Sequence, residues 1–514
     1  MSTRTLRLIL GDQLNASHSW YQQQDDKVSY LIAELPQEVG YVKHHVQKVC
    51  AFFAAMREFT AALQAAGHDV IYLTLDETQH HATLAELIAD LCSQHKVATF
   101  QYQLPDERRL RDQLSRLSLE GVAISAAETE HFLLPEAEFP RFIKAGQHNR
   151  MDSFYRKMRK RLDILMEEGK PKGGQWSFDA DNREPLRKDD LANVPEPLCF
   201  ANDVTDILAR LERHGVCTFG KAQAQLLWPI NRRQAKALLA HFCTVCLPNF
   251  GRFQDAMTDQ SPLGWSLYHS RLSFALNSKM LHPGQVIAAA LAAYEADDAI
   301  NIAQIEGFVR QIIGWREYVR AVYWVNSEQY DAQNFLLAER SLPEWFWDGD
   351  TKMRCLSQAI TQSLDYAYAH HIQRLMVVGN FALIAGLSPD EVEAWYLGIY
   401  IDAIEWVEQP NTRSMALFAD GGWVATKPYA ASGNYINKMS DHCQSCHYNV
   451  KERSAPNACP FMSLYWHFLA QNKATLGTNP RMAFPYRTWD KMADTAKTET
   501  LARAQAYLHS LNEL

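Results

Sequence analysis

The sequence lacks any apolar run long enough to cross a bilayer, and it has no excess of basic side chains. The longest plainly apolar run in the later chain, from Val286 to Tyr294, covers nine residues, whereas a transmembrane helix needs about 20. The 51 Lys and Arg are outnumbered by 59 Asp and Glu, which gives a net charge of −8. We therefore predict no membrane span and no general positive field, so any contact with nucleic acid requires a local basic patch.

Cysteine is also sparse, with 10 residues among 514, which excludes a disulfide scaffold. The N-terminal apolar stretch Leu6–Leu10 contains Arg7 and is followed by Gly11 and Asp12. We therefore expect no secretory leader and a cytoplasmic protein. In a reducing compartment, clustered cysteines are first interpreted as metal ligands.

The first 130 residues alternate short apolar runs with helix-period segments. The predicted strands are Leu6–Leu10, Val28–Ala33, Val70–Leu75, Val97–Tyr102 and Gly121–Ser125, and the predicted helices are Tyr41–Ala66, His81–Leu91 and Asp106–Leu117. This alternation predicts a parallel sheet with helices on both faces. The first strand ends in Gly11-Asp12-Gln13-Leu14, so the GxGxxG dinucleotide fingerprint is absent. A ligand could still bind at the carboxyl ends of the strands.

Three regions follow from the pattern as a whole. Residues 1–130 form the α/β domain, and residues 131–200 are a proline-punctuated connection with one predicted helix, Met151–Glu168. Residues 201–514 are predicted to be all-α, with helices over Lys221–Leu247, Gln285–Ala296, Ile302–Trp324, Cys355–Ala369 and Pro389–Glu408. The fold class is therefore α/β plus all-α.

Four cysteines stand out: Cys355 alone, the pair Cys443 and Cys446, and Cys459 followed by proline. A C-x-x-C pair places two thiolates on one metal centre, and two further thiolates would complete an iron–sulfur cluster or a structural zinc site. Zinc could instead use Cys443, Cys446 and Cys459 with His442 or His447. The string from Cys443 to His447 also matches the haem attachment motif C-x-x-C-H, which requires an exported chain. The residues alone leave these alternatives open, together with unliganded buried thiols.

Other motifs have plain structural interpretations beside functional ones. Cys243 and Cys246 lie in an apolar helical stretch and are predicted to be buried core residues. A histidine such as His370 or His371 is, taken alone, more often a hydrogen-bonded core residue than a proton donor. The basic stretch from Phe154 to Arg161 suits phosphate neutralisation, although such runs often form a solvated helix face.

Six segments together resemble those of the photolyase/cryptochrome superfamily, specifically the prokaryotic (6-4) photolyases that carry a four-iron four-sulfur cluster. The segments are Leu10–Leu14, Tyr41–His45, Gln175–Arg183, Leu267–Ser273, Gln311–Tyr318 and His370–Arg374. Cys355, Cys443, Cys446 and Cys459 fall where the cluster ligands of that family fall. The resemblance extends over nearly the whole chain.

The resemblance implies an N-terminal antenna domain and a C-terminal helical domain that holds FAD. It implies a 6,7-dimethyl-8-ribityllumazine antenna near Asp12, Glu34 and Glu38. It also implies FAD contacts from Tyr268, His269, Ser270, Arg271, Leu272 and Ser273 at the phosphates and from Arg374, Asn380, Asp402 and Glu408 nearer the isoalloxazine. Serine hydroxyls, backbone amides and an arginine are groups that a pyrophosphate requires.

The chemistry that the resemblance implies is light-driven repair of (6-4) photoproducts in DNA by electron transfer from reduced FAD. His371 matches the histidine that delivers a proton, with His370 beside it, and Trp347, Trp395 and Tyr396 match an electron relay. UV-damaged DNA is the implied partner, and we expect a monomer. The alternatives are a cryptochrome-like photoreceptor, a cyclobutane dimer photolyase, and a zinc-stabilised nucleic-acid-binding protein.

Overall fold

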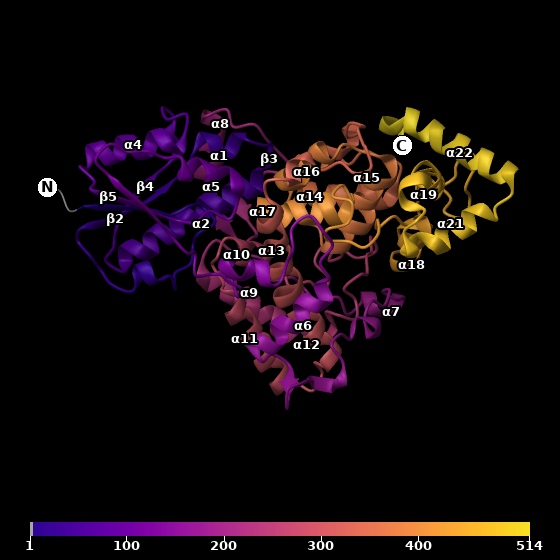
Figure 1. The fold of residues 1–514 in the computed structure, drawn as a ribbon, viewed down its shortest axis with the longest axis horizontal. Coiled ribbons are helices and arrows are strands. Elements are labelled where there is room, and N and C mark those ends of the chain that lie inside the picture. The colour runs from indigo at the N-terminus through magenta and orange to yellow at the C-terminus, as the bar shows by residue number, and fades with distance from the viewer. Residues whose placement is uncertain (1–3) are drawn as a thin grey trace.

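A computed structural model describes residues 4–514. The molecule is elongated, with the parallel sheet at one end and the C-terminal helices at the other (Figure 1). No helix within the described residues is long and apolar enough to span a membrane.

The N-terminal part is built on one five-stranded parallel sheet with strand order β4-β2-β1-β5-β6. The strands are β1 Thr5–Leu8, β2 Val28–Ala33, β4 Asp69–Leu73, β5 Thr99–Gln103 and β6 Ala123–Ala127. The order reverses between β1 and β5, which creates a topological switch point where ligands bind in open α/β sheets. The predicted parallel sheet is therefore confirmed.

Helices cover both faces of this sheet. They are α1 Pro36–Gly40, α2 Val46–Ala65, α3 Leu75–Thr78, α4 Leu84–Gln94 and α5 Arg108–Ser115. One core cluster joins Leu8 and Leu31 of the sheet to Leu87 of α4. Another joins Tyr30 and Ile32 to α2, because neighbouring residues of a strand point to opposite faces.

The middle of the chain contains a shorter helix than the one predicted over Met151–Glu168. Helix α6 spans Met151–Leu162 and ends before Asp163, which adopts a left-handed conformation with φ of 52°. The chain then forms the short hairpin β7 Met166–Glu167 and β8 Lys170–Pro171, followed by α7 Lys188–Leu191. The predicted helix end at Glu168 was wrong, because the helix that carries the basic run ends at Leu162, before the left-handed residue Asp163.

The remainder is largely helical, as predicted. Its helices are α8 Thr205–Arg213, α9 Arg232–His241, α10 Ser273–Asn277, α11 Pro283–Ala296, α12 Ile302–Val309, α13 Glu317–Asn326, α14 Arg354–Tyr366, α15 Asn380–Ala385, α16 Pro389–Ile399, α17 Glu405–Gln409, α18 Gly433–Met439, α19 Pro460–Gln471, α20 Lys473–Leu476, α21 Ala483–Asp490 and α22 Asp494–His509. The two-residue strands β3 His44–His45, β9 Asn202–Asp203, β10 Thr218–Phe219 and β11 Gln225–Leu226 complete the regular structure.

Two of the predicted helices are broken. The segment predicted as one helix over Lys221–Leu247 is helical only from Arg232, because β11 precedes it. The segment predicted over Pro389–Glu408 is interrupted between α16 and α17, and this interruption carries Asp402. The second break is important for the site because it exposes backbone carbonyls that a continuous helix would satisfy internally.

Four helical segments widen into π-helical turns, at Phe242–Cys246, Arg310–Arg316, Gln373–Gly379 and Pro410–Ala416. Such turns are uncommon and occur frequently at functional sites. The turn at Gln373–Gly379 contains Arg374, one of the predicted flavin contacts.

Candidate active site

The predicted flavin residues come mainly from three segments that meet in space. The first is the loop that contains Tyr268 and His269 and leads into α10, the second contains His370, His371 and Arg374, and the third is the break that carries Asp402. The rings of His269 and His370 stack at 4.3 Å with 13° between their planes. Asn277 Nδ2, at the end of α10, donates to Asp402 O at 2.7 Å, which joins the helix after the first segment to the third segment.

A buried ion pair between Arg374 and Asp402 lies at the centre of this arrangement. Arg374 Nη1 and Nη2 donate to Asp402 Oδ1 and Oδ2 at 2.9 and 3.2 Å. Burial acts to raise the pKa of Asp402, but the Arg374 charge and its hydrogen bonds outweigh burial, so this pKa lies below its ordinary value. Arg374 also lies 3.8 Å from the centroid of the Tyr400 ring, so the guanidinium is held on two sides.

The two adjacent histidines have different environments. His370 is 2% exposed, and neither of its ring nitrogens has a hydrogen-bond partner. Burial lowers its pKa well below the ordinary value. His371 is exposed. Desolvation of the imidazole by the surrounding protein is the largest cause that lowers the pKa of His371, and the positive charges of Arg374 and Arg183 add to it. Together they lower this pKa to about 4. Of the pair, only His371 can exchange a proton with a molecule bound at the surface.

Several predicted flavin contacts use their side chains elsewhere in the protein. The Asn380 amide donates to Ala431 O at 2.9 Å and accepts from Ala431 N at 3.0 Å. Arg271 Nη2 donates to Leu198 O at 2.8 Å, although its Nε has no partner. The Tyr268 hydroxyl donates to Asn193 O at 2.9 Å. These contacts position backbone around the site and leave fewer side chains free for a ligand.

Glu408 is the remaining predicted isoalloxazine contact, and it is 5% exposed. Burial raises its pKa, while the charge of Arg374 opposes that rise. Its carboxylate accepts a short hydrogen bond from the Thr412 hydroxyl. Glu408 is therefore a carboxyl group held close to the Arg374–Asp402 pair.

Of the aromatic residues Trp347, Trp395 and Tyr396, the first lies at the surface and the last contacts the backbone of Arg374. Trp347 is 40% exposed, whereas Trp395 and Tyr396 are buried. Trp395 Nε1 donates to Phe346 O at 3.0 Å, and the rings of Trp395 and Tyr396 are 5.5 Å apart. The Tyr396 hydroxyl donates to Arg374 O at 2.6 Å. Trp395 also packs against Phe346, the residue before Trp347, with ring centroids 5.1 Å apart.

The four predicted cluster cysteines line one small cavity. Cys355 lies in the first turn of α14, Cys443 and Cys446 lie in the turn after α18, and Cys459 caps α19. A Cβ atom at Gly433 would lie 3.1 Å from the Cys459 sulfur, so the glycine leaves room beside this thiol. Burial raises the pKa of Cys459 to about 12 and that of Cys443 to about 11.

The ligand set of this cavity suits two kinds of metal centre. In residues 4–514 the one set of three or more potential ligand atoms lying within 4.8 Å of one another is Asp259, Asp441 and His442, so no three of the cavity sulfurs lie that close together. Four thiolates are the ligands of a structural zinc ion and also of an iron–sulfur cluster.

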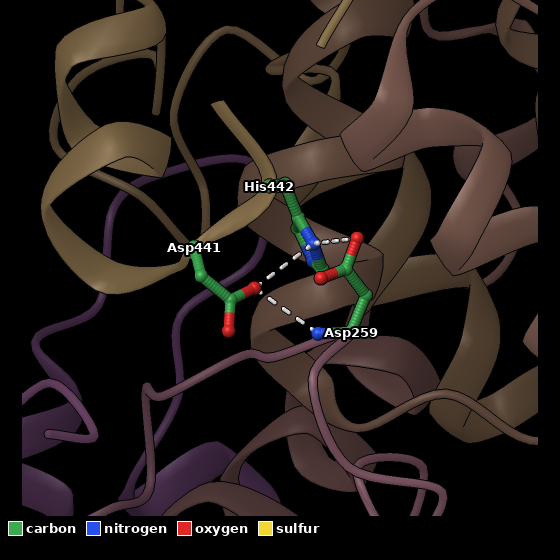
Figure 2. Close-up of side chains that lie close together, drawn as sticks. All are labelled: Asp259, Asp441 and His442. Atoms are coloured by element: carbon green, nitrogen blue, oxygen red, sulfur yellow. Dashed lines mark hydrogen bonds and ion pairs between the residues drawn. The ribbon is translucent and has the colours of Figure 1, made fainter. Parts of the chain in front are cut away.

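The Asp259, Asp441 and His442 side chains point toward one another (Figure 2), and His442 also lines this cavity. His442 Nδ1 is 3.5 Å from Asp441 Oδ1 and 3.7 Å from Asp259 Oδ2. Arg354 Nε donates to Asp259 Oδ2 at 2.6 Å, and a positive guanidinium at that distance opposes a cation. Because Arg354 precedes Cys355 and His442 precedes Cys443, this network holds the two cysteine-bearing segments together.

A second cavity, of about 140 Å³, lies at the carboxyl ends of β1, β2 and β5. Its polar lining comprises Asp12, Glu38, Tyr41, His44, Lys48, Asp106 and Glu107. Two of the predicted antenna residues, Asp12 and Glu38, are therefore brought together there. Glu34 does not line the cavity. Its carboxylate accepts from the Tyr72 hydroxyl and Leu75 N and pairs with Arg210, so its role is to hold β2 and α3 together.

Sequence reasoning missed the buried basic groups around this cavity. Lys279 is 1% exposed and pairs with Asp12 at 2.7 Å and with Asp106 at 2.8 Å. Lys48 and His44 line the cavity itself. The sequence marks Tyr41–His45 only as a motif, and the signal for Lys48 is a lysine in the first turn of a helix whose next turns are largely apolar.

Comparisons with known proteins show the family to which the chain belongs. Residues 7–227 match the family model described as deoxyribodipyrimidine photo-lyase-related protein. The chain is 40% identical over 510 residues to a protein of Agrobacterium fabrum named (6-4) photolyase, and the match covers 99% of each chain.

Solved structures show the same fold at low identity. One is a bacterial class III photolyase from Agrobacterium tumefaciens, with a TM-score of 0.53, 13% identity, and coverage of 85% of this chain and 86% of that one. Another is a cryptochrome from Synechocystis, with a TM-score of 0.56, 11% identity and 98% coverage of both chains. From the full-length match, the chain belongs to the bacterial (6-4) photolyase family, and it has the fold of photolyases and cryptochromes.

Proposed function

We propose that the protein repairs (6-4) photoproducts in DNA by light-driven electron transfer from reduced FAD. The observation that carries the proposal is the exposed His371 beside the buried Arg374–Asp402 pair, in a chain 40% identical over its full length to a named (6-4) photolyase. A repair enzyme for this lesion needs a proton donor at the surface and a flavin site behind it. His371 would be the proton donor, and the Arg374–Asp402 pair would belong to the flavin site.

The residues present fit FAD. Buried polar atoms without a partner lie in the predicted flavin segments, namely His269 Nε2, both ring nitrogens of His370, and Arg271 Nε. Such atoms are rare in folded proteins and call for a ligand or water. The loop Tyr268–Ser273 would hold the phosphates, and Arg374, Asp402 and Glu408 would lie at the flavin ring. When bound and reduced, FAD supplies the electron that light transfers to the lesion.

His371 would move the proton. A (6-4) lesion must rearrange as an oxygen passes between its two rings, and a ring N–H of His371 would protonate that oxygen. With the lesion absent, the low pKa keeps His371 neutral at neutral pH. Negatively charged phosphate groups beside the imidazole raise the pKa of a histidine, so substrate binding would load the proton where it is needed. The lesion has to leave the base stack to reach this position.

The buried pair Trp395 and Tyr396 would carry electrons from exposed Trp347 to the flavin. The exposure of Trp347 and the bond from the Tyr396 hydroxyl to Arg374 O support a path with one end in solvent and the other at the flavin site. These residues would return the flavin to its reduced form.

Cys355, Cys443, Cys446 and Cys459 would hold a four-iron four-sulfur cluster. Four thiolates are the ligand set of such a cluster, all four line one cavity, and these positions match the cluster ligands of the family that the sequence resembles. The network of Arg354, Asp259 and His442 would hold the ligand-bearing segments in place.

The cavity at the sheet edge would hold the antenna, 6,7-dimethyl-8-ribityllumazine. Its position at the switch point of a parallel sheet, the carboxylates Asp12 and Glu38, and the unpartnered ring nitrogens of His44 support a polar aromatic ligand. Light absorbed there would reach the flavin by energy transfer.

The deciding experiment is a repair assay on oligonucleotides that contain either a (6-4) lesion or a cyclobutane dimer, with and without light. We expect light-dependent repair of the (6-4) lesion alone. Repair of the cyclobutane dimer instead would favour the other photolyase class. Binding of flavin without repair of either lesion would favour a photoreceptor.

A further inference from the structure

A line of aromatic rings joins Trp395 to the cavity that the four cysteines line. The ring of Phe346 lies 5.1 Å from that of Trp395, and the ring of Trp345 stacks on Phe346 at 4.8 Å with 27° between the planes. The ring of Phe381 follows at 5.2 Å and that of Phe461 at 5.9 Å. Phe461 itself lines the cavity. Each separation is one of direct ring contact, so contacting rings extend from one site to the other.

The whole line is excluded from solvent. All five rings are at most 2% exposed. Trp395 comes from α16, Phe381 from α15 and Phe461 from α19, helices that follow one another toward the C-terminal end of the molecule (Figure 1). Protein interiors are close-packed, and an electron tunnels more readily through packed atoms than across a gap. The line is therefore a medium suited to electron transfer between two buried sites.

Trp345 is the ring in this line that can itself be oxidised. The three others beyond Trp395 are phenyl rings, which give up an electron far less easily than an indole. Trp345 Nε1 donates to Leu511 O at 2.8 Å, and a backbone carbonyl does not take up a proton. An oxidised Trp345 thus keeps its proton and needs only one electron to recover. Trp347, at 40% exposure, can instead lose its proton to water.

We propose that Trp345 forms a second branch of the electron relay, between Trp395 and the four-cysteine site. This inference rests on the relay and the cluster proposed above. After light has drawn one electron from Trp395 to oxidised flavin, Trp395 recovers it from Trp345, and Trp345 recovers it from the cluster. No bond breaks and no proton moves. The flavin gains the one electron that the cluster loses, and a small thiol in solution returns it to the cluster.

Two substitutions of the same kind separate this role from packing. Trp345→Phe keeps a ring between Phe346 and Phe381 but removes the indole. Trp228→Phe is the matched control, because Trp228 is 1% exposed and its Nε1 donates to Tyr366 O at 3.1 Å. It loses an indole and a hydrogen bond of the same kind, but it lies in a different core cluster, away from the line. Iron and flavin contents of each protein are measured first.

The test illuminates protein that holds oxidised flavin, freezes it, and records the EPR spectrum of the iron at low temperature. In its usual resting state a four-iron four-sulfur cluster gives no EPR signal, whereas loss of one electron produces one. We expect a light-dependent cluster signal in the parent and a larger one in Trp347→Phe, which closes the branch to solvent. The signal should fall roughly tenfold or more in Trp345→Phe, because a one-electron step depends exponentially on potential. Trp228→Phe should match the parent.

The outcomes distinguish the branch from the assignments beneath it. Full iron and flavin contents without a light-dependent cluster signal, in the parent and in Trp347→Phe, would overturn the branch, as would equal signals in Trp345→Phe and Trp228→Phe. Phe381→Leu interrupts the same line without altering an indole and should also lower the signal, so the test survives a loss of iron in Trp345→Phe. A parent without iron would refute the cluster assignment, and one without flavin would refute the flavin assignment.

Discussion

Replacing Asp402 by Asn should destabilise the protein far more than replacing an aspartate in a surface ion pair. The side chains of Arg374 and Asp402 are 16% and 9% exposed, and two hydrogen bonds join them. The substitution keeps the shape but leaves the guanidinium buried, with only Glu408 as a nearby negative charge. Removing one partner of a buried pair typically costs about 3–5 kcal/mol, so we expect a loss in that range.

Asp206→Asn is the matched control, because Arg57 and Asp206 pair at 2.8 Å with side chains 38% and 53% exposed. Exposed pairs contribute about 0–1 kcal/mol. Urea unfolding of both variants and the parent, in the same excess of FAD, measures the two losses once the flavin contribution of each protein, calculated from its own Kd for FAD, has been subtracted.

The pH dependence gives a second check on Asp402. Its pKa in the folded protein lies below the unfolded value, so its stabilising contribution is complete above about pH 4 and is lost as pH falls further. The difference in free energy of unfolding between the parent and Asp402→Asn should shrink in that acid range. Equal losses for Asp402→Asn and Asp206→Asn at neutral pH would refute the reasoning.

The remaining predictions concern the metal, the proton and the DNA. Cys355→Ala should lose iron and soluble yield together, whereas Cys243→Ala, in the apolar core, should keep full iron content by elemental analysis; full iron in the first variant would remove Cys355 from the site. His371→Ala should lower light-driven (6-4) repair by about 10²–10⁴-fold while flavin absorbance and lesion binding persist; repair at the parental rate would exclude the proton-donor role. Neutralising exposed Lys157 should weaken DNA binding and reduce its salt slope, whereas Arg159→Gln should lower stability instead, because that guanidinium is buried and donates to Leu165 O and Trp176 O; equal effects on DNA affinity would contradict this division.

The fold was largely predictable because its signals are local. Apolar runs such as Val28–Ala33 are buried strands of a parallel sheet, and their burial on both faces makes them continuous in the sequence. The break between α16 and α17 was not predictable, because the apolar period continues across Tyr400 and Ile401, both of which are buried. There, tertiary contacts outweigh the helical pattern.

The candidate site was predictable only in part, for a related reason. Sequence motifs pointed to His371 and Arg374, but motifs do not show which side chains are already hydrogen-bonded or ion-paired within the protein. Asn380 is bound at both ends of its amide by Ala431, and Glu34 is bound by Tyr72 and Arg210. Conversely, Lys48 has no sequence neighbour that reveals its partners, which lie some 350 positions further along the chain.

The four-cysteine cavity also has a consequence for the unfolded chain. Cys355 lies on α14, while the other three cysteines lie more than 80 residues later. A cluster bonded to all four would act as a covalent crosslink that closes this long loop. By analogy with a disulfide across a loop of about 100 residues, closure removes chain entropy worth about 4–5 kcal/mol from the unfolded state. Helices α15 to α18, which lie inside this loop, would then owe part of their stability to the closed ring, and oxidative loss of iron would open the ring and make that region the first to be cut by proteases.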